Sequence, residues 1–235
     1  MSHPESAPES STQDVSAAQD VSAAQIVTAP HAEGEAFLAG VEPVFARLIA
    51  QYGPCQLFTS QQYFSVLVTM IIGQQISTAA ARTIARRVVE MVQPQELTPE
   101  RFAEFSEESW RACGLSTPKR RTLRNVLDHL AQQPDFFERL ADPAMASQRG
   151  AMLRTIRGIG PWTAQMMEIF AFGNSDVWPL GDLGLQLAFR DQFQLPEVPD
   201  AATLEQRSIP WRPHRTLATW YLWRSRGFIP QSNLE

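Results

Sequence analysis

The sequence predicts an all-α protein of about ten helices. Apolar residues recur every three or four positions over most of the chain, which is the period of a helix that buries one face. Polar or Pro-containing helix starts, such as 98–100 and 106–110, precede several of these stretches. No segment has a convincing strand pattern.

The first expected helix begins at Glu35, buries one apolar face and is ended by the Tyr52-Gly53-Pro54 turn. Two short helices are expected to open at 98 and 106, and a basic helix should run from about 119 to 132. The remaining expected helices cover about 61–72, 77–91, 135–140, 145–156, the segment after Gly160, 183–193, 202–207 and 213–226.

The composition is that of an ordinary globular protein, with 44% hydrophobic residues among 235. The sequence contains no run of about 18 apolar residues, and residues 1–30 lack the features of a signal peptide. We therefore expect a cytoplasmic protein with no membrane partner.

Residues 1–33 are rich in Ser, Ala, Gln, Pro and Glu and contain a repeated hexad at 13–18 and 19–24. Such a segment has little to bury, so a disordered acidic tail is expected, followed by one domain over 34–235. The net charge of −5 hides a near-neutral domain, because six acidic and no basic residues lie before position 37. The remainder of the chain carries 20 basic and 19 acidic residues.

Arginines and the lysine gather in local clusters that are suited to a phosphate backbone. A solvated helix face is the alternative for each cluster. The clusters are Arg82/Arg86/Arg87, Lys119/Arg120/Arg121/Arg124, Arg149/Arg154/Arg157 and Arg207/Arg212/Arg215.

The segment Gly158-Ile159-Gly160-Pro161 lies between two helical patterns and predicts a tight turn from helix to helix. Glycine tolerates positive φ and a close backbone approach, and Pro161 suits the first position of the next helix. The start of that helix has free N–H groups and a partial positive charge, which favours an anion such as a nucleic-acid phosphate. An ordinary hairpin without a ligand is the alternative.

A Pro- and Gly-containing loop at 177–181 leads to Asp182, which precedes the apolar-periodic segment 183–189. This position predicts Asp182 as a helix N-cap. A carboxylate held in this way could also stabilise a developing positive charge or orient a water molecule, whereas a purely structural cap is the alternative.

Together these segments resemble the helix-hairpin-helix DNA glycosylases, whose signature is a Gly-hydrophobic-Gly hairpin, a Gly/Pro-rich loop and a catalytic aspartate. The resemblance is greatest to the 3-methyladenine DNA glycosylase II (alkylpurine glycosylase) branch and extends over about residues 36–230. It implies two helical lobes with an active-site cleft between them, and it places the hairpin at about 145–172 and the catalytic loop at 173–182. The other matching segments are 71–77, 158–164, 211–213 and 220–223.

The resemblance implies that Asp182 is the catalytic residue, which stabilises an oxocarbenium-like sugar and guides water. It also implies a base pocket whose aromatic faces attract a cationic alkylated purine. A place in the core is the alternative for the tryptophans, and is the expectation for Trp220. The implied pocket residues are Trp162, Met166, Trp178 and Trp223.

For DNA binding, the resemblance implies a wedge that fills the space of a flipped nucleotide. Its candidates are Gln74, Gln75 and Ile76, and a capped turn without a ligand is the alternative. The implied backbone-binding residues of the hairpin are Gly158, Ile159 and Gly160. The backbone carbonyls of Arg154, Ile156 and Ile159 match positions that hold a structural monovalent cation in this family.

Two cysteines, Cys55 and Cys113, lie far apart and supply neither a disulfide framework nor a metal cluster. Relatives with an iron-sulfur cluster need four cysteines, so no iron-sulfur cluster and no other cofactor is expected. Relatives that also cut the strand use a lysine four residues after the first hairpin glycine, where this chain has Trp162.

The sequence thus predicts a monofunctional base-excision glycosylase that flips and hydrolytically removes alkylated purines such as 3-methyladenine and 7-methylguanine. Its partner would be damaged double-stranded DNA, and its product an abasic site. We expect a monomer that acts in the cytoplasm, at a bacterial-type nucleoid. Two alternatives stay open, namely a catalytically silent helix-hairpin-helix module that only binds DNA, and a glycosylase for another damaged base.

Overall fold

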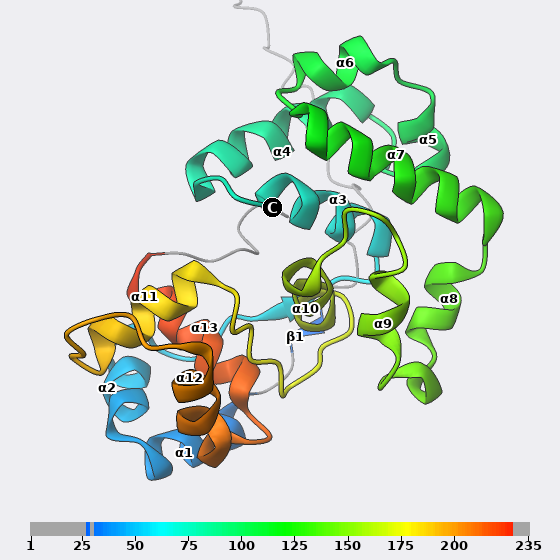
Figure 1. Ribbon diagram of the computed structural model, residues 1–235. Coiled ribbons are helices and arrows are strands. Elements are labelled where there is room, and N and C mark those ends of the chain that lie inside the picture. Colours follow the sequence, from blue (N-terminus) through cyan, green and yellow to red (C-terminus); the bar gives the residue numbers. More distant parts are fainter. Residues whose placement is uncertain (1–26, 29–30, 228–235) are drawn as a thin grey trace, which may run out of the picture.

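A computed structural model describes residues 27–28 and 31–227 of the chain, and helices dominate this part (Figure 1). It contains thirteen α-helices and two short 3-10 helices, which confirms the all-α fold class. Most of the predicted disordered tail, including its repeated hexad, lies outside the described residues.

One α-helix forms beyond the expected ranges because the first predicted helix is divided. It becomes α1 (Ala32–Val41) and α2 (Pro43–Tyr52). Pro43 stands at the start of α2, where its ring cannot continue the helix before it, and Glu42 caps the new start.

The expectation of no strand is wrong at one point. Strand β1 (Val27–Thr28) pairs antiparallel with β2 (Phe58–Thr59), so that Val27 lies opposite Thr59. Two residues are too few to show the alternation that identifies a strand in a sequence.

One group of packed helices joins the first helices of the described chain to its last ones (Figure 1). The Tyr221 hydroxyl donates to Glu35 over 2.6 Å, and the Cys55 backbone N–H donates to the same carboxylate oxygen over 2.7 Å. Besides α1 and α2, the group contains α11 (Leu183–Gln192), α12 (Ala201–Ser208), η2 (Ile209–Trp211) and α13 (Arg215–Ser225).

The middle of the chain forms the second group, in which α3 packs on both α4 and α7. Its elements are α3 (Tyr63–Gly73), α4 (Thr78–Val92), α5 (Pro99–Ala103), α6 (Glu107–Ala112), α7 (Thr117–Gln132), α8 (Phe136–Ala141), η1 (Pro143–Met145) and α9 (Arg149–Leu153). That the two groups form lobes with a cleft between them stays a prediction.

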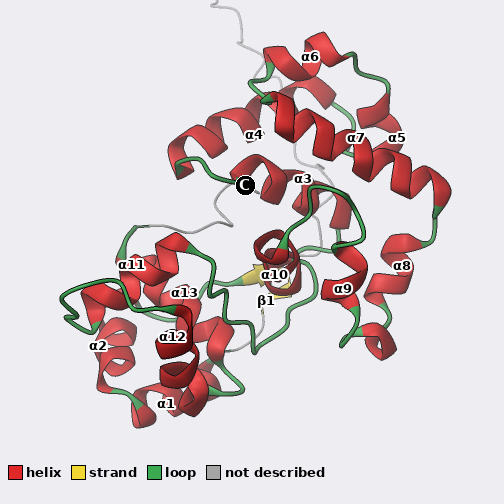
Figure 2. Cartoon of the chain, viewed as in Figure 1, coloured by secondary structure: helices red, strands yellow, loops and turns green. Residues whose placement is uncertain are grey.

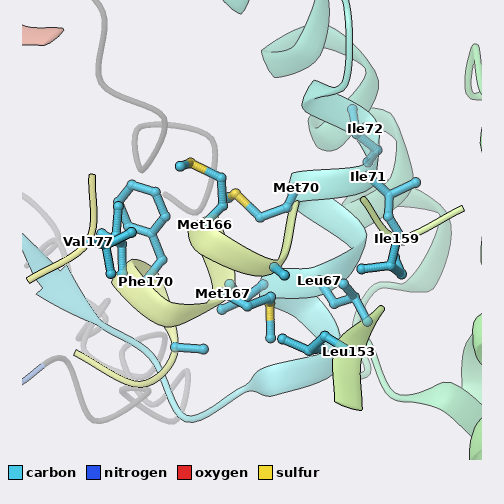
Figure 3. Packing of buried hydrophobic residues seen from close by; sticks show 14 of the residues in the cluster. Leu67, Met70, Ile71, Ile72, Leu153, Ile159, Met166, Met167, Phe170 and Val177 are labelled. Atoms are coloured by element: carbon cyan, nitrogen blue, oxygen red, sulfur yellow. The ribbon is translucent and has the colours of Figure 1, made fainter. Parts of the chain in front are cut away.

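Helix α10 (Pro161–Phe170) lies between the two groups, next to the small sheet (Figure 2). Its apolar residues face α3, and Figure 3 shows Met166 and Met167 beside Met70 and Leu67. On the other side, the Phe170 ring stacks on Trp223 of α13 with centroids 6.1 Å apart. One core therefore holds α10 against both groups.

None of the helices within the described part of the chain is both long and apolar enough to cross a membrane.

Candidate active site

Asp182 is the N-cap of α11, as its position in the sequence predicts. Its Oδ1 accepts a hydrogen bond of 2.6 Å from the Leu185 backbone N–H, and the residue is only 5% exposed. The cap fixes the carboxylate at the helix start, where N–H groups and the helix dipole favour negative charge.

Two tryptophans also donate to this carboxylate. The Trp162 indole Nε1 lies 2.7 Å from Oδ2, and the Trp223 Nε1 lies 3.0 Å from Oδ1. Asp182 takes part in none of the ion pairs between described residues. Neutral donors thus hold a buried negative charge that no cation neutralises, which leaves it able to stabilise a positive charge on a ligand.

The loop before Asp182 is tied to α13. Arg215 donates to both carboxylate oxygens of Asp176, and its Nη1 donates to Glu205 over 3.1 Å. The Thr216 hydroxyl accepts from the Val177 backbone N–H over 2.9 Å. These bonds place the loop that carries Asp182 next to the helix that carries Trp223.

Three of the four predicted pocket residues are almost fully buried. Met166, on α10, is fully buried in the hydrophobic core. Trp223, which donates to Asp182, is 1% exposed. Trp178 donates to the Leu204 carbonyl over 3.2 Å and meets the Trp211 ring edge-on, so its contacts are those of a core residue. Trp162 is half-buried and is the predicted pocket residue with the most accessible ring. The roles of all four in a base pocket stay predictions.

The hairpin turn is built around Gly158. Its φ is +103°, and a Cβ added there would lie 2.2 Å from Oγ1 of Thr122 on α7, so both backbone and space require glycine. Pro161 is the first residue of α10, as predicted, and Gly160 is its N-cap. The expected helix over 145–156 is shorter at both ends, since α9 begins at Arg149 and ends at Leu153.

The wedge candidates take different positions. Gln74 donates to the Thr163 hydroxyl over 2.9 Å and to the Gly158 carbonyl over 3.3 Å, so it is held against the hairpin. Gln75 is exposed and has a φ of +55°, and Ile76 is 37% exposed. Gly73, at the end of α3, stands so close to Trp162 that an added Cβ would lie 3.7 Å from its ring. The loop of the three wedge candidates, residues 74–76 (the predicted wedge loop), therefore begins next to the Trp162–Asp182 pair.

Many of the clustered basic residues have structural contacts instead of free cationic groups. Arg212 and Arg215 pair with Asp176 and Glu205. Arg120 and Arg124 share Glu107, and Arg86 pairs with Glu90. Within the described ranges, the exposed arginines beside the hairpin that form no ion pair are Arg121, Arg154 and Arg157.

Two further cluster members are buried. Arg149 donates to the Leu140 carbonyl over 2.6 Å, covers the Phe172 ring and lies 3.9 Å from Glu168. Burial raises the pKa of Glu168, although the Asn174 amide and Arg149 oppose this shift. Burial on α7 lowers the pKa of Lys119.

Sequence reasoning missed Thr122 and Asn125 on α7. The Asn125 side-chain amide donates to the Arg157 carbonyl over 2.8 Å, across 32 positions of the chain. No local pattern marks either residue, because each acquires its contact only when α7 packs beside the hairpin.

The carbonyls of the predicted cation site belong to the segment between α9 and α10, which forms the same turn. The Ile156 carbonyl accepts a hydrogen bond of 3.0 Å from the Ile159 backbone N–H, which leaves one of its two lone pairs available. Oxygen ligands of this type suit a hard cation, but cation binding stays a prediction.

Comparison with known proteins agrees with this geometry. A family model described as "HhH-GPD superfamily base excision DNA repair protein" matches residues 68–213. The chain is 28% identical to DNA-3-methyladenine glycosylase 1 of Schizosaccharomyces pombe over 201 residues, covering 82% of this chain and 86% of the relative.

Solved structures give the same result. The 3-methyladenine DNA glycosylase Mag1 of Schizosaccharomyces pombe, in complex with abasic DNA, superposes with a TM-score of 0.75 at 27% identity, covering 84% of this chain and 98% of that one. DNA-3-methyladenine glycosidase from Bacillus halodurans has a TM-score of 0.65 at 32% identity, covering 85% and 90%. This chain belongs to the HhH-GPD superfamily of base excision DNA repair proteins.

Proposed function

We propose that this protein is a monofunctional DNA glycosylase that removes alkylated purines, such as 3-methyladenine and 7-methylguanine, from double-stranded DNA. The observation that carries the proposal is the buried Asp182 carboxylate, held by three N–H donors and neutralised by no cation among the described residues. The names of the relatives, which are 3-methyladenine glycosylases, support the same substrate class.

Loss of an alkylated base needs little help for the leaving group, because alkylation has already made the base cationic. The sugar passes through an oxocarbenium-like state, and a fixed carboxylate stabilises that positive charge. In this account Asp182 performs this step and orients the water that attacks the sugar. Its three hydrogen bonds keep it in place, so little reorganisation accompanies the reaction.

The accessible ring of Trp162 supplies the aromatic face for the cationic base, which cation–π attraction favours by about 0.5–2 kcal/mol. Met166 and Trp223 would form the buried wall behind it, whereas the side-chain contacts of Trp178 are those of a core residue. Flipping leaves a gap in the duplex, and the exposed Gln75 and Ile76 are the side chains available to fill it.

The hairpin and its arginines would bind the phosphates of the DNA backbone. Gly158, Ile159 and Gly160 lead into α10, and the exposed Arg154 and Arg157 flank the turn. The carbonyls of Arg154, Ile156 and Ile159 would hold a monovalent cation with a structural role, whose positive charge would favour a nearby phosphate. The hydrolysis itself requires no redox cofactor.

Strand cleavage through a Schiff base would need a lysine in the site. Trp162 takes that position, and the only lysine of the chain, Lys119, is buried on α7. We therefore expect an intact abasic strand as product. Borohydride treatment during turnover should trap no covalent enzyme–DNA adduct, and an adduct mapped to the active site would exclude a monofunctional mechanism.

The direct test is base release from duplex DNA that carries methylated purines, followed by chromatography, with uracil- and 8-oxoguanine-containing duplexes in parallel. The proposal predicts release of 3-methyladenine or 7-methylguanine. Release from a neutral lesion alone would indicate a glycosylase for another base. Tight DNA binding without any release would indicate a silent binding module.

A further inference from the structure

Two neutral side-chain amides from different segments of the chain hold consecutive carbonyls at the hairpin tip. Asn125 of α7 donates to the Arg157 carbonyl over 2.8 Å, and Gln74, just after α3, donates to the Gly158 carbonyl over 3.3 Å. The Gln74 amide also donates to the Thr163 hydroxyl in the first turn of α10, over 2.9 Å. The tip is thus fastened to two neighbouring segments as well as to its own helix.

These bonds set the direction of a donor. In a trans peptide the carbonyl and the following N–H point in opposite directions. Because Asn125 binds the Arg157 carbonyl, the N–H of Gly158 points away from that side chain. Within the described part of the chain this N–H has no acceptor. Thr122 fills the space against Gly158, so the peptide cannot rotate freely about it.

We propose that Asn125 and Gln74 are positioning residues for DNA binding, which fix the hairpin tip so that the Gly158 N–H faces a backbone phosphate. The inference rests on the proposed function. Gln74 belongs to the predicted wedge loop, but its two hydrogen bonds give it another role: it connects that loop to the hairpin. The position of the wedge loop relative to the phosphate-binding turn is thereby fixed, while the exposed Gln75 and Ile76 can enter the DNA.

Because Asn125 and Gln74 are neutral, their effect on DNA binding can be distinguished from that of the charged arginines. An amide adds no charge, whereas Arg154 and Arg157 carry the charge that attracts the phosphates. Loss of an arginine contact should reduce the salt dependence of binding by about one unit of slope. Loss of a positioning amide should weaken binding by a similar factor at every salt concentration.

The experiment compares the full-length wild type with Asn125→Leu and Gln74→Met. Gln132→Leu is the matched control, because Gln132 is an exposed amide near the end of the same helix as Asn125. Affinity for a short duplex with an abasic analogue is measured over a salt series, together with thermal unfolding. Glycine-selective ¹⁵N labelling reports the Gly158 amide resonance with and without DNA.

We expect each site variant to bind about fivefold more weakly, which corresponds to the loss of one hydrogen bond of about 1 kcal/mol between Gly158 and a phosphate. The salt slope should not change, and the melting temperature should fall by no more than a few degrees. The Gly158 amide resonance should shift on DNA addition in the wild type and in Gln132→Leu, and much less in Asn125→Leu. Wild-type affinity and an intact Gly158 shift in both site variants would overturn the inference. If Asn125→Leu unfolds at a much lower temperature than the wild type, the Gly158 shift is measured in the milder variant Asn125→Ala, and that result tests the inference.

The same series separates this inference from the proposed function. A wild type that neither binds abasic DNA nor releases any base would contradict the proposed function. A wild type that does both, with site variants that equal it, would contradict only the positioning role.

Discussion

The Trp162 indole nitrogen donates to Oδ2 of Asp182 over 2.7 Å, and this bond joins the first turn of α10 to the start of α11. The same ring lies beside Gly73, where the wedge loop begins. Trp162 therefore contacts the predicted catalytic group and lies beside the predicted wedge loop, in addition to its proposed place in the base pocket.

Replacing Trp162 by phenylalanine separates these roles, since Trp162→Phe keeps an aromatic face and removes the donor. A hydrogen bond to a charged group contributes about 1.5–3 kcal/mol, so we expect the single-turnover rate of excision to fall by about tenfold to a hundredfold. Affinity for abasic DNA should change little. A variant with the wild-type rate would show that the bond to Asp182 has no part in the reaction.

Trp178 should matter for stability more than for catalysis. Trp178→Phe removes the hydrogen bond to the Leu204 carbonyl and leaves space beside Trp211, for which we expect a loss of about 1–3 kcal/mol in the free energy of unfolding. Urea unfolding measures this loss. The excision rate of the folded variant should equal that of the wild type, and a large fall in rate without loss of stability would return Trp178 to the base pocket.

Gly158→Ala should disturb the hairpin, because the added Cβ would overlap Thr122 and the positive φ is strained for alanine. We expect a loss of about 1–3 kcal/mol in stability and a marked fall in affinity for abasic DNA. Adding Thr122→Ala should restore part of the stability by removing the overlapping atoms. If the double variant is no more stable than the single one, contact with Thr122 is not the cause.

His129 gives a pH dependence of stability. Burial, assisted by the charge of Arg139, lowers its pKa, and its Nε2 has no partner in the described structure. The unfolded chain therefore binds a proton more readily below about pH 6.5 than the folded one does, so the free energy of unfolding decreases as the pH falls. In melts between about pH 7.5 and pH 5, His129→Phe should lose less stability than the wild type. Equal pH dependence would exclude His129 as a source.

The parts of the site that depend on local sequence could be predicted. The N-cap Asp182 and the first helical residue Pro161 stand where capping and proline geometry place them. Gly158 likewise has the positive φ that a tight turn requires. Each of these rests on the few residues around it.

Contacts between distant segments could not be predicted. The hydrophobic period shows which face of α7 is buried, but not that Thr122 and Asn125 meet the hairpin. For the same reason the sequence predicts Arg215 and Arg149 as candidates for phosphate contacts, although in the fold they lie beside Asp176 and Glu168. Partner choice is decided by helix packing, which the period of a single helix does not encode.

The central claim, that Asp182 stabilises the sugar cation, is tested most directly by single-turnover release of 3-methyladenine with Asp182→Asn. The control is Asp200→Asn, which changes an exposed N-cap aspartate of α12 in the same way. We predict that Asp182→Asn binds abasic DNA but loses at least about a hundredfold in rate, while Asp200→Asn keeps the wild-type rate. Excision by Asp182→Asn at the wild-type rate would contradict the account.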